Sequence, residues 1–496
     1  MKRLLKAVAG LLAVLAVAVA VAHWGLGYQV RLDGSGKPRI MRVQSPEAQA
    51  AAVEAHRAAQ QARPSEAPAA KPEPAADAAP GQVSPGDASP GEAVGIAAAD
   101  APTRGETGSD APYWVGFRGP LRDGHYRERP IQTAWPAGGP APLWKQPAGG
   151  GYASFALAHG RAFTIEQRRQ QEVVAAYDMA TGRELWSHGW NAEFREWMGG
   201  DGPRATPTWF DGRVYALGAL GELRCLEDDT GRMLWRVNIL DDNGASNLQW
   251  GMAASPLVFN DTVVVLPGGP QGRSVVAYDR LTGARQWSSL DDKQAYSSPM
   301  LVTLNGHSQI LAVTSRRLVA LAPDSGELLW DFPWVTANDI NASQPLLVGE
   351  QRILLSSAYG HGAAVIEVTD SGAGQSARAV WESPRLKNRF SSSVIHEGFI
   401  YGLDENILTC LDAETGEVQW KAGRYGHGQF VLASGHLIVL SEQGELALVR
   451  ATPERHEELV RFPVLSGKTW NHPAIEDGVL LVRNLAEIAA FDLRVR

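Results

Sequence analysis

The sequence predicts an all-β protein, an eight-bladed β-propeller whose blades are four-stranded antiparallel sheets. A pattern of Asp, Thr and Gly that closes on a tryptophan recurs along the chain, as in VAAYDMATGRELW at 174–186 and LTCLDAETGEVQW at 408–420. The copies follow one another at about 43 residues, which is the period of a propeller blade rather than of a helical repeat. The 52 glycines and 30 prolines also favour turns over long helices.

Eight copies of the pattern can be aligned between residue 152 and the end of the chain. Seven of them close on an aromatic residue: Trp186, Trp235, Trp287, Trp330, Trp381, Trp420 and Phe462. The eighth copy, IAAFDLR at 488–494, stops before any tryptophan. We therefore expect the segment APLWKQP at 141–147 to supply the missing outer strand, so that Trp144 completes blade eight and closes the ring, because an open ring would expose a sheet edge.

Each copy is typical of two β-hairpins. Alternating apolar residues lead into D-x-x-T-G, where the Asp and Thr side chains hydrogen-bond the turn and the glycine takes the left-handed conformation. An Asp-Gly turn at 211–212 is an example of the second hairpin upstream. One such sheet would expose two apolar faces, which radial stacking covers. The recurring tryptophan is expected to fill the gap between adjacent blades, where its large apolar area fits best.

The first 28 residues are expected to be a membrane anchor or a signal segment. Basic residues precede an uncharged run at 7–27, which approaches the length that a bilayer core requires. A cleavable signal peptide is the alternative, because Ala20, Val21 and Ala22 form an A-x-A site. The expected location is therefore the inner membrane with the propeller in the periplasm, or the periplasm or exterior if the segment is cleaved. No cysteine lies nearby, which argues against a lipid anchor.

Residues 29–112 are expected to be a disordered stalk, and 113–496 the propeller. From Ser45 to Pro112 the chain is rich in Ala and Pro and has too few large apolar residues to bury a core. A helix is possible at 46–62, and the rest favours an extended spacer. The formal net charge of −8 argues against a nucleic-acid partner. We expect a monomeric propeller.

The D-x-x-T-G-x-x-x-W copies, together with YWVGFRGPLRDGHY at 113–126, resemble the pyrroloquinoline-quinone (PQQ)-like repeat β-propellers. The resemblance covers nearly everything from residue 113 to the end and implies this fold. The superfamily contains quinoprotein alcohol dehydrogenases and also non-enzymatic members such as the propeller lipoprotein of the outer-membrane barrel-assembly machine. Fold and function therefore have to be argued separately.

A binding site is expected on the propeller axis, at the face where the innermost strands begin. The candidate residues are Tyr152, Arg204, Trp250, Tyr296, Asn341, Lys387, Asn388, Arg389, His427, Trp470 and His472. A deeper ring of small polar residues, such as Ser255 and Ser298, is interpreted as the result of crowding at the axis. The loop at 191–202 carries Phe194 and Trp197, which are expected to cover this face or to pack onto it.

The resemblance implies PQQ as a possible cofactor, with Arg204, Lys387 and Arg389 pairing its carboxylates and a tryptophan stacking on its ring. The catalytic quinoproteins, however, also carry an adjacent cysteine pair and a calcium-binding set of Glu, Asn and Asp. This chain has only Cys225 and Cys410, at equivalent positions of copies two and six. No metal-binding motif is found. The favoured hypothesis is a membrane-tethered scaffold that binds a protein or an envelope component; the alternatives are a PQQ-dependent dehydrogenase of alcohols or sugars and a small-ligand sensor.

Overall fold

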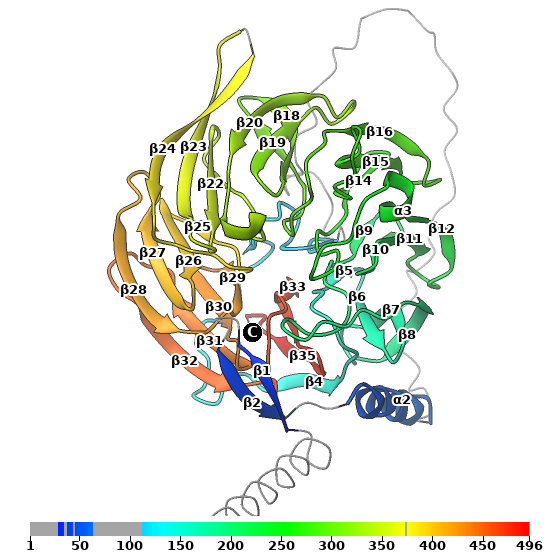
Figure 1. Cartoon of the computed structure of the whole chain (residues 1–496). Helices are drawn as coiled ribbons and strands as arrows, with labels where there is room; N and C mark the ends of the chain where they lie inside the picture. Colours follow the sequence, from blue (N-terminus) through cyan, green and yellow to red (C-terminus); the bar gives the residue numbers. More distant parts are fainter. Residues whose placement is uncertain (1–27, 34–36, 43–44, 63–111, 373, 496) are drawn as a thin grey trace, which may run out of the picture.

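Eight sheets stand in a ring around a central axis (Figure 1). The computed structural model describes residues 28–33, 37–42, 45–62, 112–372 and 374–495. Within these ranges the predicted fold, an all-β propeller of eight blades built from four-stranded antiparallel sheets, is confirmed. Blade seven has one additional strand, β3 (His125–Tyr126), which pairs parallel with the inner strand of that blade.

The strands of each blade follow in chain order from the axis outward, and blade eight takes its outer strand from the beginning of the domain. Blades one and two contain β5 (Ala156–Ala158), β6 (Arg161–Arg168), β7 (Gln171–Asp178) and β8 (Glu184–Asn191), then β9 (Thr208–Phe210), β10 (Arg213–Leu217), β11 (Glu222–Glu227) and β12 (Met233–Asn238). Blades three and four contain β13 (Leu257–Phe259), β14 (Thr262–Val265), β15 (Val275–Asp279) and β16 (Arg285–Ser289), then β17 (Met300–Leu304), β18 (His307–Val313), β19 (Arg317–Leu321) and β20 (Leu328–Pro333).

Blades five and six contain β21 (Leu346–Val348), β22 (Arg352–Ser357), β23 (Gly362–Asp370) and β24 (Gln375–Ser383), then β25 (Val394–His396), β26 (Phe399–Asp404), β27 (Ile407–Asp412) and β28 (Val418–Arg424). Blades seven and eight contain β29 (Gln429–Ala433), β30 (His436–Leu440), β31 (Glu445–Arg450) and β32 (Glu457–Pro463), then β33 (Ala474–Glu476), β34 (Val479–Arg483), β35 (Glu487–Asp492) and β4 (Pro142–Pro147). Two short helical turns, α3 (Ile239–Asn243) and η2 (Ala337–Asp339), lie in connecting segments.

The ring is closed by the strand that the sequence predicted. β4 pairs antiparallel with β35 and places Trp144 opposite Ala490. The indole of Trp144 then reaches into blade one, where its Nε1 donates a hydrogen bond to the carbonyl oxygen of Met179 at 2.8 Å. Blade eight is therefore made from the two ends of the domain, which leaves no open edge at this seam.

The tryptophans dock onto the next blade, as expected. The Nε1 atoms of Trp186, Trp235 and Trp381 donate to the backbone carbonyls of Asp228, Arg280 and Ala413, each in the following blade. Each ring also lies on the glycine of the neighbouring turn, so closely that an added Cβ would come within 3 Å of it. The pattern fails at Trp330, whose Nε1 donates instead to Gln309 in its own blade, because blade five replaces the tight turn with the long hairpin β23–β24.

The apolar core is divided among the seams between blades. Buried clusters join blades two and three, blades four and five, and blades six and seven. At the closing seam one large cluster joins blades seven, eight and one. Each sheet is thus buried on both faces, and the stability of every blade depends on its two neighbours.

Part of the expected stalk is structured. β1 (Tyr28–Leu32) and β2 (Pro38–Arg42) form a hairpin, and α2 (Pro46–Ala62) confirms the predicted helix. The helix packs on blades eight and one: Ala50 and Val53 are buried, Arg57 forms an ion pair with Glu184 at 2.9 Å, and Glu54 pairs with Arg169. Within the expected stalk at 29–112, the described residues thus contain a hairpin and a docked helix, and the helix buries the apolar side chains of Ala50 and Val53.

The expected membrane anchor at 1–28 lies outside the described residues except for Tyr28. Within the described ranges, no helix has the length and apolar character that crossing a bilayer requires.

Blade one also buries a carboxylate. Glu172 on β7 is fully buried and accepts a hydrogen bond from the backbone N–H of Ala219 at 2.7 Å. Its Oε2 atom has no hydrogen-bond partner among the described residues. Burial away from water raises the pKa of Glu172 to about 7, since the charged form is poorly solvated.

Changing Gly182 to Ala is expected to destabilise the closing seam. Gly182 has a φ of 73°, and an added Cβ would lie 2.6 Å from the indole of Trp144. Gly306→Ala is the matched control, since Gly306 has a φ of 78° but no atom within 4 Å of the added Cβ. Both variants carry a backbone cost of about 1–2 kcal/mol, and Gly182→Ala adds overpacking of about 1–3 kcal/mol. Equal melting temperatures for the two variants would contradict the docking role of Trp144.

The Glu172→Gln variant is expected to remove one component of the pH dependence of stability. Because the folded pKa is raised, the native state binds more protons than the unfolded state between about pH 4.5 and 7, so this component weakens the fold as pH rises through that window. Relative to the parent, the variant gains stability from pH 5 to pH 8, by roughly 2–3 kcal/mol. Denaturant unfolding at several pH values measures this gain, with the exposed Glu417→Gln as control. A parallel pH profile for parent and Glu172→Gln would exclude the effect.

Candidate functional site

A belt of hydrogen bonds joins the blades near the axis. The backbone N–H groups of Ser154, Thr206 and Ser255 each donate to the side-chain hydroxyl of the corresponding residue in the next blade, Thr206, Ser255 and Ser298, at 2.9 Å. The belt continues through Gln344, whose Oε1 accepts from Ser298 N–H at 3.2 Å and whose own N–H donates to Ser392. The deeper ring of small polar residues therefore has a structural role: it fixes the blades where they approach most closely.

The segment at 113–126 closes one end of the axis. Arg118 is 1% exposed and donates to the backbone carbonyls of Ser392 and Ser393 in blade six. Arg122 donates to the carbonyls of Ser255 and Pro299, in blades three and four. These buried guanidinium groups tie the segment across the ring, and desolvation lowers the pKa of Arg118 to about 10 and of Arg122 to about 9. The channel is thus a blind cup, and Phe117 forms part of its lining.

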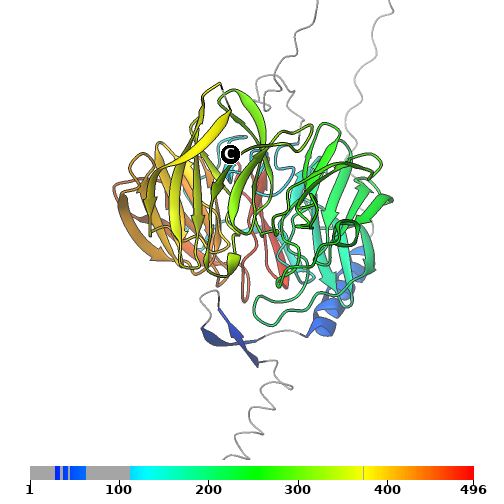
Figure 2. The ribbon, with the colours of Figure 1, turned by 45° about the horizontal axis from the view of Figure 1, so that its top comes forward.

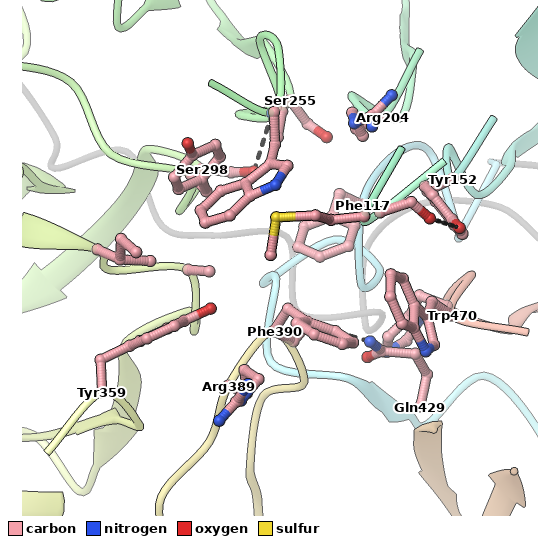
Figure 3. Close-up of a pocket in the computed structure, with 18 of the residues that line it drawn as sticks. Phe117, Tyr152, Arg204, Ser255, Ser298, Tyr359, Arg389, Phe390, Gln429 and Trp470 are labelled. Carbon is pink, nitrogen blue, oxygen red and sulfur yellow. Dashed lines mark hydrogen bonds between the residues drawn. The ribbon is translucent and has the colours of Figure 1, made fainter. Parts of the chain in front are cut away.

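The wall of the cup is predominantly aromatic. The cavity has a volume of about 410 Å³, in the range of small-molecule and side-chain sites. Figure 3 shows Phe117, Tyr359, Phe390 and Trp470 around the same hollow. The full set of large apolar side chains in the lining is Phe117, Tyr152, Met198, Trp250, Tyr296, Ile340, Tyr359, Phe390 and Trp470.

The loop at 191–202 forms one side of the mouth. Its Met198 and Gly199 line the cup, while Phe194 packs down and is 8% exposed. The hydroxyl of Tyr152 and the ammonium of Lys468 both donate to the carbonyl of Gly199 and hold the loop in place. Trp197 is 67% exposed. Of the two residues singled out from the sequence, Phe194 packs onto this face and Trp197 is not part of the lining; Met198, which was not expected, reaches the cup instead.

Cations at the mouth lie over aromatic faces. The Arg204 guanidinium carbon is 4.4 Å from the ring centroid of Phe194, and that of Arg389 is 5.2 Å from Tyr359. Lys468 Nζ is 4.0 Å from the centroid of the Trp470 ring. Such contacts attract the cation to the negative face of the ring and orient it. Burial lowers the pKa of Arg204 from its usual value.

His472 is a neutral component of the lining. Burial, and then the adjacent Arg118, hold the pKa of His472 well below its usual value. Its Nε2 lies 3.2 Å from Arg118 Nη1 and accepts from it, and its Nδ1 lies 2.6 Å from the carbonyl of Pro473, to which it donates. The imidazole therefore links the segment 113–126, which plugs one end of the axis, to blade eight, and it does not serve as a free base.

Seven of the eleven expected site residues line the cup: Tyr152, Arg204, Trp250, Tyr296, Arg389, Trp470 and His472. Asn341, Lys387, Asn388 and His427 do not belong to the lining.

Three of those four side chains are buried elsewhere. The Asn341 amide donates to the carbonyls of Thr314 and Ser315, so its neighbours Ile340 and Ala342 face the cup instead. Asn388 hydrogen-bonds the serine hydroxyls of blades five and six, and His427 is buried against the ring of Phe390. Lys387 is half-buried, with its backbone N–H donating to Asp404.

Several lining residues were not expected from the sequence. Phe117 lies in the segment that precedes the repeats, and Tyr359 lies in the turn between β22 and β23, so neither falls at an aligned strand start. Asp33 comes from the amino-terminal hairpin. Phe390 occupies the first aligned position of blade six, so the repeat alignment places it at the axis although it is not among the candidate residues; Phe117, Tyr359 and Asp33 have no repeat signal.

The lining does not fit PQQ with its calcium ion. Arg204 already donates to the carbonyls of Gly200 and Gly202, and Arg389 pairs with Glu405 at 3.2 Å. In the part of the chain that the structure describes, no group of three His, Cys, Asp or Glu side chains could hold a metal ion. The only two cysteines of the chain are buried, unbonded and in different blades, so they cannot form the adjacent pair. The aromatic faces alone do not build that site.

The fold and the repeats define a propeller of the PQQ-like repeat class. Residues 169–422 match the family PQQ_2, described as "Outer membrane protein assembly factor BamB". The match covers more than half of the chain, and the chain belongs to this family.

Curated relatives carry the same description. The chain is 24% identical over 263 residues to the outer membrane protein assembly factor BamB of Bordetella pertussis, a match that covers 50% of this chain and 59% of the relative. It is 24% identical over 285 residues to the BamB of Burkholderia pseudomallei, with coverage of 55% and 66%. The matches thus span about three-fifths of the length of these relatives.

Solved structures from both functional branches share the fold. BamB from Moraxella catarrhalis superposes with a TM-score of 0.51 at 14% identity, covering 72% of this chain and 98% of that one. The quinohemoprotein alcohol dehydrogenase from Comamonas testosteroni superposes with a TM-score of 0.55 at 13% identity, with coverage of 78% and 81%. At these identities the likeness shows the fold alone, so it does not select a function.

The Ser298→Ala variant is expected to weaken the belt. Removing the hydroxyl leaves the buried N–H of Ser255 without its acceptor, which costs about 1–3 kcal/mol. The measurement is the free energy of unfolding, with the exposed Ser376→Ala on blade five as control. If both substitutions have the same small effect, the hydroxyls fill space at the axis and do not link the blades energetically.

Proposed function

We propose that this chain is an extracytoplasmic, membrane-associated binding module whose axial cup and surrounding face engage a protein partner in the assembly of outer-membrane proteins. The observation that carries the proposal is the cup itself, an aromatic-walled, closed-ended recess without a catalytic donor set. Aromatic side chains with cations at their faces provide large contact area at low conformational cost, which is the composition of binding hot spots.

Family membership supports the scaffold role, since curated members are described as outer membrane protein assembly factors. The low identity and partial coverage of those relatives leave the particular partner to experiment. The anchoring of the chain in the inner membrane through residues 1–28 is part of the same proposal and rests on the amino-acid pattern of that segment. An anchored propeller keeps its cup near the membrane surface and concentrates it for a membrane-bound partner.

The competing enzyme hypothesis is less well supported. A PQQ-dependent dehydrogenase requires cations that pair with the carboxylates of PQQ, acidic side chains that bind the metal ion, and a general base, all of which converge on the cofactor. Of the described residues that line the cup, only Asp33 is a carboxylate, and it comes from outside the propeller.

The test is site-specific photo-crosslinking in intact envelopes. A benzophenone amino acid replaces Met198 at the mouth of the cup, and Leu281 on the exposed rim of blade three is the control position. We expect a discrete adduct with an identified outer-membrane assembly protein from position 198 and none from 281. The double variant Phe390→Ala and Trp470→Ala should reduce that adduct at least about tenfold, because it removes two aromatic walls.

Two results would overturn the proposal. Equal adducts from positions 198 and 281 would show that the cup is not the binding surface. Saturable binding of PQQ with Ca²⁺, together with alcohol-dependent reduction of a dye, would establish the dehydrogenase instead.

A further inference from the structure

The amino-terminal hairpin lies beside one face of the propeller (Figure 2). Asp33, the first residue after β1, lines the cup itself although it belongs to a segment outside the ring. Its backbone N–H donates to the carbonyl of Lys37, and its Oδ1 accepts from the N–H of Lys37, both at 2.8 Å. These two bonds tie the ends of the strands together and fix the position of Asp33.

The charge of the lining is asymmetric. Among the described lining residues, the propeller contributes Arg204 and Arg389 and no carboxylate, while the hairpin contributes Asp33. Arg389 also pairs with Glu405 outside the lining, and Arg204 donates to the carbonyls of Gly200 and Gly202, so a guest uses only the remaining donors of each guanidinium. Lys468 adds a third cation beside the lining, over the face of Trp470. A recess with cationic and aromatic walls favours a guest that combines a carboxylate with apolar surface.

The hairpin is held close to the cup by a short connection. Residues 43–45 separate the end of β2 from α2, which is docked on blade one by the ion pairs of Glu54 and Arg57 and on blade eight by the hydrogen bond between His56 and Gln146. A segment tethered by so few residues to a docked helix has a high effective concentration at the mouth. A second ligand for the same place must compete with it.

We propose that the cup receives an acidic peptide turn from the protein partner, and that the β1–β2 hairpin with Asp33 occupies this place in the free chain. The proposal rests on the proposed function and names the chemistry of the partner segment. A volume of about 410 Å³ accommodates a few side chains and excludes a folded domain. The partner's carboxylate takes the place of Asp33 in the lining, and its apolar side chains pack on the aromatic wall.

The hairpin thereby lowers the apparent affinity of the cup for any other peptide. In the free chain the hairpin occupies the cup most of the time, so only a fraction of the chains has an open cup. The apparent affinity for a partner is its intrinsic affinity for the open cup reduced by that fraction. Specificity follows, because an uncharged peptide gains too little from the cationic mouth to displace Asp33.

The test uses the full chain in detergent micelles and a fluorescently labelled peptide with the sequence of residues 28–42, YQVRLDGSGKPRIMR. In a variant of the chain, residues 28–42 are replaced by a Gly/Ser stretch of equal length, which vacates the mouth and keeps the tether. Fluorescence anisotropy should show saturable binding to this variant and binding at least about tenfold weaker to the parent chain. A peptide with the Asp33→Asn change should bind about tenfold more weakly than the parent peptide.

Substitutions in the cup locate the binding. In the hairpin-replaced chain, Arg389→Ala should weaken peptide binding about tenfold, whereas Arg385→Ala, an exposed residue of the same loop that is absent from the lining, should leave it unchanged. Thermal melting confirms that each variant is folded; if Arg389→Ala does not fold, Phe390→Leu replaces it. Quenching of tryptophan fluorescence, to which Trp250 and Trp470 contribute, provides a second readout of occupancy.

The outcomes separate this inference from the proposed function. Equal binding of the parent peptide and the Asp33→Asn peptide, or equal binding to parent and hairpin-replaced chains, would overturn the inference even if Met198 still cross-links to a protein partner. Loss of both the peptide binding and the cross-link would overturn the proposed function as well.

Discussion

The docking of the repeat tryptophans onto the next blade, which all but Trp330 follow, is the interaction on which the rest of the structure depends. The indole lies on a glycine in the left-handed conformation and donates to a backbone carbonyl beside it, so a flat apolar ring and one hydrogen bond are used together. Because each blade is buried by its neighbours, these contacts fix the radial spacing of all blades. That spacing then sets the width of the axis and hence the size of the cup.

The axis is shaped by two devices that have different physical origins. The hydroxyl belt fixes the blades at their innermost strands, where eight strands meet and leave room only for small side chains. The plug at 113–126 closes one end with two buried arginines that satisfy backbone carbonyls of several blades. The backbone carbonyl oxygens at the strand starts would otherwise lack hydrogen-bond donors, and the two guanidinium groups supply them. The same segment closes the channel at one end, so that it becomes a recess.

The amino-terminal elements connect the recess to whatever precedes the propeller. The helix α2 covers the seam where the ring is closed, since its partners Gln146 and Glu184 lie on β4 and β8. The hairpin β1–β2 lies beside one face of the ring in Figure 2, and Asp33 next to β1 lines the cup. In the proposed role, a movement of this one short hairpin would change the access to the cup without any change in the propeller.

The repeat pattern by itself determined the number of blades, the turns, the role of the tryptophans and the closing strand, because each copy buries its apolar faces only against another copy. Seven of the eleven expected residues line the cup. Tyr152, Arg204, Tyr296 and Trp470 do so from the first aligned position of their blades and His472 from the third, whereas Trp250 and Arg389 come from the loops that precede the aligned positions. Only the tertiary structure decided which side chains face the cup: Asn341 and Asn388 turn away because buried polar groups there need their amides. Phe117, Tyr359 and Asp33 enter the site from segments outside the aligned positions, and their placement depends on long-range packing that no local pattern encodes.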